Sequence, residues 1–142
     1  MFKKLTSTQI WSASSTDWAS LILRLSLGLL MLTHGFPKFM KYFSGEEIKF
    51  ADPVFIGMGV TFAFAVFAEF FCSILIILGL WTRLAVIPLM ATMLVAVSII
   101  HANDPMGKKE LPLLYLFPFI ALFLLGSGRF SMDAFLNKNR NV

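Results

Sequence analysis

Four long apolar stretches constrain what this chain can fold into more than any other feature of its sequence. Of the 142 residues, 58% are hydrophobic and 14% are charged, whereas about a quarter of the residues in a soluble domain are charged. The apolar residues lie in four blocks instead of being scattered, as expected for an integral membrane protein. We therefore predict an all-α fold, an integral membrane four-helix bundle with antiparallel, up-down topology.

Cap and stop residues define the expected helices. Asp17 is a helix-start residue, Gly79 and the run from Gly126 to Gly128 are helix-stop signals, and Ser131 caps a short amphipathic tail. At this length we expect residues 1–142 to form a single transmembrane domain. The predicted helices cover about residues 18–42, 55–80, 84–101 and 111–125, and the tail covers 131–138.

The distribution of basic residues predicts the orientation. Four crossings place both termini on one side of the membrane, and lysine and arginine are favoured in cytoplasmic loops. The side with the termini has one more basic residue than the opposite side, so we expect a multi-pass protein with both termini in the cytoplasm. The residues compared are Lys3, Lys4, Arg83, Arg129, Lys138 and Arg140 against Lys38, Lys41, Lys49, Lys108 and Lys109.

The first apolar stretch, from Leu21 to Lys38, has a polar face. At 100° per residue, its charged, histidine and glycine positions fall within an arc of about 120°. A helix surrounded by lipid has no reason to gather polar residues in this way, whereas a helix that faces protein or a ligand does. The face comprises Arg24, Gly28, Met31, His34, Gly35 and Lys38.

Glu69 lies deep in the second apolar stretch. It is about 11 residues, or ~16 Å, from the end of its expected helix, where an unpaired carboxylate costs a few kcal/mol. Arg24 lies within about 7 Å of the same depth on the antiparallel neighbour. We therefore expect Arg24 to pair with Glu69, with Arg83 as a second candidate partner. Such a pair is either functional or a structural ion pair that sets the helix register.

Further ionisable residues extend this polar interior. Arg83 and His101 are 18 residues apart, which is five α-helical turns, so they share a helix face. Each of these groups also has a structural interpretation, as a hydrogen-bond partner between helices or as a polar residue at the membrane boundary. We expect an outer level of His34, Lys38 and His101, and a cytoplasmic level of Arg24, Arg83 and the Glu69 carboxylate.

The remaining composition excludes several kinds of redox and binding site. The single cysteine, Cys72, excludes an intramolecular disulfide, a paired-cysteine redox site and a cysteine-ligated iron–sulfur cluster within this chain. No nicotinamide or flavin motif is present, and we expect no metal site. The net charge of +4 comes without a clustered basic run, so we expect contacts with membrane lipids and no nucleic-acid partner.

Short motifs follow one another in order from about Leu21 to Leu136. They are Arg24-x-x-x-Gly28, His34-Gly35-x-x-Lys38, Ala68-Glu69, Gly79-Leu80-x-Thr82-Arg83, His101 and Gly126-x-Gly128-Arg129-x-Ser131-x-Asp133. Their order and placement resemble the DoxX family of small bacterial four-helix membrane proteins. The resemblance implies a helical bundle in the bacterial inner membrane that is an oxidoreductase or a subunit of one. One family member is a subunit of an archaeal thiosulfate:quinone oxidoreductase, and others are associated with oxidative and thiol stress.

Our leading hypothesis is a quinone-interacting membrane subunit of an oxidoreductase system. A quinone needs an apolar slot, donors for its carbonyl oxygens and a proton route, which histidines and a carboxylate supply. The chain has no redox-cofactor motif of its own, so its electrons would come from a partner, and we expect a protein partner or a homo-oligomer. The candidate catalytic residues are Glu69, His34 and His101, and the candidate ligand-binding residues are Arg24, Lys38 and Arg83.

Three other functions remain open at this point. The chain is alternatively a non-enzymatic scaffold or assembly subunit, with its charged face fixing the bundle. It is alternatively a passage for a small solute or ion, with Glu69 as the gate. The third alternative is a haem protein, with His34 and His101 as the iron ligands.

Overall fold

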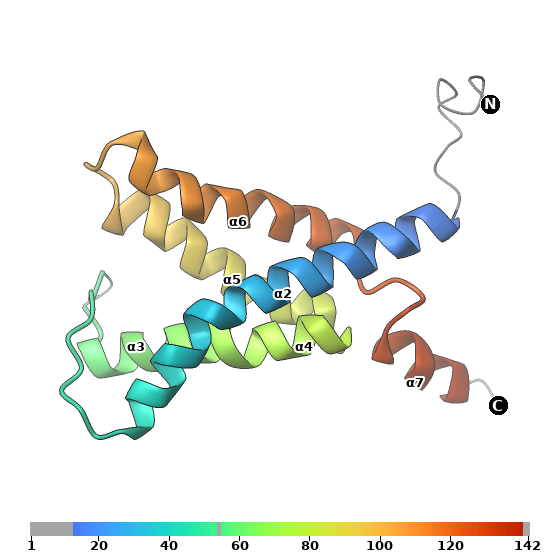
Figure 1. Cartoon of the computed structure of the whole chain (residues 1–142), viewed down its shortest axis with the longest axis horizontal. Coiled ribbons are helices and arrows are strands. Elements are labelled where there is room, and N and C mark those ends of the chain that lie inside the picture. The colour runs from blue at the N-terminus through green and yellow to red at the C-terminus, as the bar shows by residue number, and fades with distance from the viewer. Residues whose placement is uncertain (1–12, 54, 141–142) are drawn as a thin grey trace.

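The computed structural model describes residues 13–53 and 55–140, with side chains placed for residues 15–53 and 55–137. Lys3 and Lys4, which entered the orientation argument, lie outside these residues, as do the side chains of Lys138 and Arg140. Within the described part of the chain, all regular secondary structure is helical, as predicted, and no strand occurs. Figure 1 shows long helices lying along one another, with a short C-terminal helix set apart at one end.

The helices correspond to the apolar blocks but differ from the predicted ranges in length and continuity. The second and third blocks each contain a π-helical segment, and the fourth helix begins at Met106, five residues before the expected Leu111. The elements are α2 (Ala13–Phe43), α3 (Met58–Val66), η2 (Phe67–Cys72), α4 (Ser73–Leu78), α5 (Thr82–Val95), η3 (Ala96–Ile100), α6 (Met106–Leu125) and α7 (Met132–Arg140).

Three helical runs in the described residues are long and apolar enough to cross a membrane. They cover Ser15–Phe43, Met58–Leu78 and Thr82–Ile100. Helix α6 is 20 residues long but begins with a charged turn that contains Lys108, Lys109 and Glu110. A fourth crossing therefore does not follow from the hydropathy and length of α6.

A very tight connection joins α4 to α5. Gly79 and Trp81 both have left-handed backbone conformations, with φ of 70° and 48°. Glycine adopts this conformation readily, whereas Trp81 does so at an energetic cost. The Asp133 carboxylate accepts a hydrogen bond from the Trp81 backbone N–H at 3.0 Å, and the Asp133 N–H donates to the Gly79 carbonyl at 3.1 Å. The start of α7 thus stabilises the turn between the second and third helical runs.

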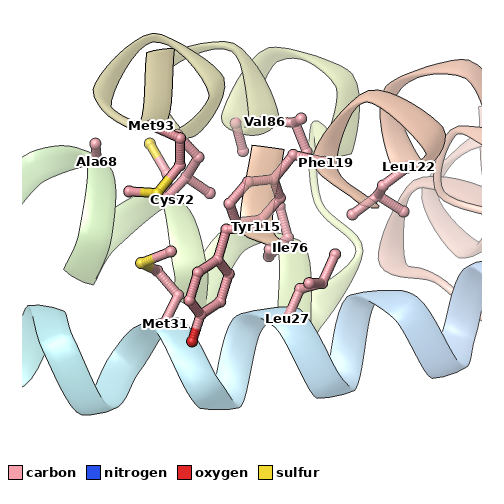
Figure 2. Packing of buried hydrophobic residues seen from close by; sticks show 12 residues of the cluster. Leu27, Met31, Ala68, Cys72, Ile76, Val86, Met93, Tyr115, Phe119 and Leu122 are labelled. Atoms are coloured by element: carbon pink, nitrogen blue, oxygen red, sulfur yellow. The ribbon is translucent and has the colours of Figure 1, made fainter. Parts of the chain in front are cut away.

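The core lies where α2, η2, α4, α5 and α6 meet (Figure 2). Helix α2 packs on α3, η2, α4 and α6, and α5 packs mainly on α6 and η2. Apolar side chains also cover the outer faces, as expected where helices contact lipid chains instead of water. The fully enclosed part of the core contains Met31, Ala68, Cys72, Ile76, Val86, Leu89, Phe119 and Leu122.

Two glycines on α2 allow the second helical run to approach closely. A Cβ atom at Gly35 would lie 2.3 Å from the backbone oxygen of Glu69, and one at Gly28 would lie 2.4 Å from the Ile77 side chain. Small residues permit this kind of backbone contact between membrane helices. The contact at Gly35 places the polar face of α2 directly against the π-helical turn that carries Glu69.

Candidate ligand site around Lys38 and Glu69

Glu69 is paired with Lys38. The Lys38 ammonium nitrogen lies 2.6 Å from both carboxylate oxygens of Glu69. The Glu69 side chain is 7% exposed and the Lys38 side chain 29% exposed. Lys38 is also 5.6 Å from the centre of the Phe50 ring, which adds a cation–π contact. Pairing with a cation reduces the cost of placing this acid within a membrane-spanning helix.

The backbone around Glu69 is specialised. Glu69 lies in the π-helical segment η2, and the Ser73 hydroxyl donates to the Glu69 carbonyl at 2.7 Å. A π-helical turn contains an extra residue and is frequent at functional sites. The turn therefore combines a displaced backbone with an ionisable side chain turned toward α2.

The expected pairing of Arg24 with Glu69 is wrong. Arg24 is fully buried, but its guanidinium donates to the backbone carbonyls of Ile76 and Ile77 at the end of α4 and to that of Phe130. Both carbonyls belong to the last turn of α4, and a cation near a helix C-terminus interacts favourably with the carbonyls there. Arg24 has a suitable depth in the membrane, but the rotation of the helices turns Lys38 toward Glu69 instead.

Arg83 has a similar capping role. Its guanidinium donates to the carbonyls of Phe123 and Leu124, at 3.2 and 3.3 Å, where α6 ends. Neither Arg24 nor Arg83 lines the cavities beside Glu69. Arg83 instead faces a separate cavity of about 510 Å³ that also contains Trp81 and Asp133. Neither arginine therefore lies beside Glu69, where the expected ligand-binding role would place it.

A small cavity with a partly polar lining, here called the polar cavity, adjoins the Lys38–Glu69 pair. Its volume is about 210 Å³, and residues from α2, η2, α5, η3 and α6 line it. The expected convergence of His34, Lys38 and His101 on one region is present here, and Glu69 belongs to this group instead of the cytoplasmic level. The polar lining residues are His34, Lys38, Glu69, His101 and Tyr115.

A hydrogen bond between a histidine and a carboxylate lies beside this cavity. His101 Nδ1 lies 2.7 Å from an Asp104 carboxylate oxygen, and both side chains are about one third exposed. The hydrogen bond from His101, helped by the charge of Lys108, outweighs desolvation and holds the pKa of Asp104 below its ordinary value. Asp104 therefore stays ionised and orients the His101 ring.

A larger apolar cavity also adjoins the pair. Its volume is about 540 Å³, and it lies between α3–η2 and α5–η3. Lys38 and Glu69 are its charged residues, and most other lining positions are apolar. Volumes of about 300–1,000 Å³ are typical of small-molecule sites. The apolar lining includes Phe64, Ala65, Phe67, Ile87, Ala91 and Ile100.

Arg83 and His101 do not share a helix face as expected, and the reason is local. The segment η3, directly before His101, is π-helical, so the α-helical period no longer applies there. Leu94, which the α-helical period places between them, is 55% exposed on the outside of the structure. His101 reaches the polar cavity because η3 turns it, while Arg83 faces the end of α6.

Tyr115 and Asp104 were missed as site residues. Tyr115 comes from α6 and packs edge-on against His34, with 6.0 Å between ring centres. Figure 2 shows its hydroxyl directed toward α2 beside Met31. A signal was available for Asp104, because it lies three residues after His101 in a polar loop. Tyr115 offered none, since an aromatic residue in an apolar helix is typical of a core.

The described residues contain no group of three or more histidine, cysteine, aspartate or glutamate side chains arranged to hold a metal ion. The fold and site instead define a helical membrane protein with an ion pair that lines both a polar cavity and an apolar cavity. The sequence profile of the DoxX family matches residues 19–102, which is more than half of the chain. The protein therefore belongs to the DoxX family. Comparison with curated proteins and with solved structures found no match.

Proposed function

We propose that this protein is a quinone-interacting subunit of a membrane oxidoreductase system. The observation that carries the proposal is the position of the Lys38–Glu69 pair, which lines both an apolar cavity of about 540 Å³ and a smaller polar one. A quinone has the matching chemistry, since its ring and isoprenoid chain are apolar while its carbonyl oxygens accept hydrogen bonds and protons.

Each group at the site has a definite role in this proposal. The apolar cavity accommodates the ring and the first part of the chain, with the rest of the chain leaving between α3 and α5 toward lipid. The Lys38 ammonium donates to a quinone carbonyl, and Glu69 neutralises that ammonium and exchanges a proton with the reduced form. His34 and His101 line the polar cavity beside the pair, where their ring nitrogens donate or accept hydrogen bonds.

The family and the composition support a proposal for the membrane, the orientation and the partners of this protein. We place the protein in the bacterial inner membrane as four antiparallel crossings, with α6 as the fourth and both termini in the cytoplasm. The chain carries no redox-cofactor motif, so a partner protein or an associated redox subunit supplies the electrons. Membrane lipids cover the exposed apolar faces, and a second copy of the chain is a further candidate partner.

Direct binding tests this function. The purified protein in lipid nanodiscs is titrated with a short-chain benzoquinone and a short-chain naphthoquinone, and binding is measured by calorimetry. We expect saturable binding of at least one of them. Ala91→Trp fills the apolar cavity from its exposed wall without disturbing the core, and we expect it to weaken binding at least about tenfold, which corresponds to ~1.4 kcal/mol.

Leu94→Trp is the matched control. It makes a similar change on the same helix, at a position that is 55% exposed and outside the apolar cavity. We expect this variant to bind quinone like the wild type. The proposal fails if neither quinone binds saturably, or if the two tryptophan variants weaken binding equally.

A scaffold subunit is the second candidate function, and the two arginines favour it. Arg24 and Arg83 stabilise helix ends through backbone carbonyls, which is a purely structural use of buried and interfacial charge. A scaffold predicts that Glu69→Gln reduces the yield of an assembled complex while leaving the activity per complex unchanged. The quinone proposal predicts instead that the activity per complex falls.

A further inference from the structure

The two cavities that adjoin the Lys38–Glu69 pair differ in the number of polar side chains that line them. The apolar cavity is bordered by side chains that face lipid, including Phe64 and Ile87, which are 62% and 46% exposed. The polar cavity contains both histidines and Tyr115. The ion pair therefore adjoins both a lipid-facing space and a space that is lined partly by hydrogen-bonding groups.

The polar cavity suits water better than it suits an organic ligand. Its volume of about 210 Å³ is below the range of small-molecule sites, which begins at about 300 Å³. A water molecule occupies about 30 Å³ in the liquid and needs two to four polar partners to stay in a protein interior. The side chains of His34, Lys38, Glu69 and Tyr115 supply such partners, so several waters fit.

The cavity also reaches the end of the molecule at which the loop between η3 and α6 lies. His101 and Leu111, on either side of that loop, line it, and Leu111 is 51% exposed. His101 is held by Asp104, whose side chain is one third exposed. The same cavity is thus lined by His101 beside the loop, by His34 and by the buried carboxylate of Glu69.

We propose that the polar cavity is an aqueous inlet through which protons reach the Lys38–Glu69 pair from the side of the η3–α6 loop. A proton from the inlet converts the Glu69 carboxylate to the neutral acid and releases the Lys38 ammonium. The reverse step returns the proton to water. The groups that face Glu69 are Lys38 and His34 from α2, Tyr115 from α6 and His101 after η3. The inference rests on the proposed function only in placing quinone in the apolar cavity.

Cysteine accessibility tests the inlet without any quinone. His34→Cys places a thiol in the cavity wall, and Phe36→Cys places one on the outer face of α2, where Phe36 is 54% exposed and outside the polar cavity. Phe36 is nearer the end of α2, so depth alone favours its labelling. We expect a charged, water-soluble methanethiosulfonate reagent to modify His34→Cys at least about tenfold faster in proteoliposomes. Native Cys72 is 1% exposed and provides the background rate.

A second pair of variants tests the inlet independently, in case the His34→Cys protein does not fold. Met31→Cys opens a thiol into the cavity, whereas Leu27→Cys lies one turn away on the same buried face of α2 and outside the cavity. Faster labelling of Met31→Cys supports the inlet. Equal rates within either pair overturn it. Absence of quinone binding leaves these rates unchanged, so failure of the inlet and failure of the proposed function are distinguishable.

Discussion

At the scale of single residues, the partner of Glu69 is the main finding. Lys38 is four residues beyond His34, which is about one helical turn, on the polar face of α2 and contacts both Glu69 oxygens at 2.6 Å. A lysine at that position is readily taken for a residue that only reaches the headgroups. Its side chain is instead 29% exposed and turned inward. The ion pair gives the first and second helical runs a fixed rotation relative to each other.

Removing one member of this pair leaves a buried charge without a partner. We expect Lys38→Met to lower the free energy of unfolding by about 3 kcal/mol, the lower end of the usual range for a broken buried pair. The double variant Lys38→Met with Glu69→Met removes both charges and regains most of that loss. Lys41→Met, on the same helix, changes the free energy of unfolding by no more than about 0.5 kcal/mol.

Denaturant unfolding of the four proteins in detergent micelles, followed by circular dichroism, measures these effects. If the double variant is no more stable than Lys38→Met alone, the Lys38 charge acts independently of Glu69.

At the scale of the elements, two π-helical segments shape the site. The segment η2 carries Glu69, and η3 ends directly before His101. Each adds about one residue to a turn, so side chains beyond it rotate away from the positions that an α-helical period predicts. This rotation explains why the expected common face of Arg83 and His101 is absent. The close contact at Gly35 then holds α2 against the displaced turn.

Gly35→Ala tests that contact. The new Cβ atom would lie 2.3 Å from the Glu69 backbone oxygen, and backbone yields less readily than a flexible side chain. We expect the free energy of unfolding to fall by about 1–3 kcal/mol, as for an overpacked core. Gly59→Ala in α3 meets nothing within 4 Å, so we expect it to be neutral or to stabilise by up to about 1 kcal/mol.

Thermal unfolding in micelles compares the two glycine variants with the wild type. A Gly35→Ala protein as stable as the Gly59→Ala protein would show that the two helices separate at no cost, contrary to tight packing.

At the scale of the whole molecule, the start of α2 is tied to the loop between α6 and α7. Arg129 N–H donates to an Asp17 carboxylate oxygen at 2.9 Å, and the Ser20 hydroxyl donates to the Gly126 carbonyl at 2.6 Å. Trp18 packs on Phe130 with 4.7 Å between ring centres. Arg24 completes the connection through the Phe130 carbonyl. Segments more than 100 residues apart in sequence therefore form one end of the bundle.

Arg24→Lys removes the planar group that reaches carbonyls on two elements at once. We expect the free energy of unfolding to fall by about 1.5–3 kcal/mol, the usual contribution of hydrogen bonds from a charged group. We also expect faster protease cleavage between α6 and α7, because Phe130 loses its contact.

Arg129→Lys is the control, since the Arg129 side chain is 77% exposed and surface ion pairs contribute about 0–1 kcal/mol. Similar cleavage rates for the two variants would mean that Arg24 does not hold this loop.

The sequence by itself determined that the chain is helical, belongs in a membrane and has a polar face on its first helix. These properties depend on hydrophobic blocks and on a regular period, both of which are local. It also identified His34, Lys38 and His101 as a group, because each lies toward the same end of its helix. Apolar composition could not decide whether α6 crosses the membrane, because its first turn is charged while the rest is apolar.

Only the tertiary structure decided which groups meet. Whether Glu69 faces Lys38 or Arg24 depends on a rotation of the second helical run that the π-helical turn sets, and no regular period encodes that turn. Arg24 and Arg83 became helix caps because the ends of α4 and α6 lie beside them, which depends on contacts between segments distant in sequence. The two cavities are likewise spaces between helices, so their sizes and linings exist only after the helices have packed.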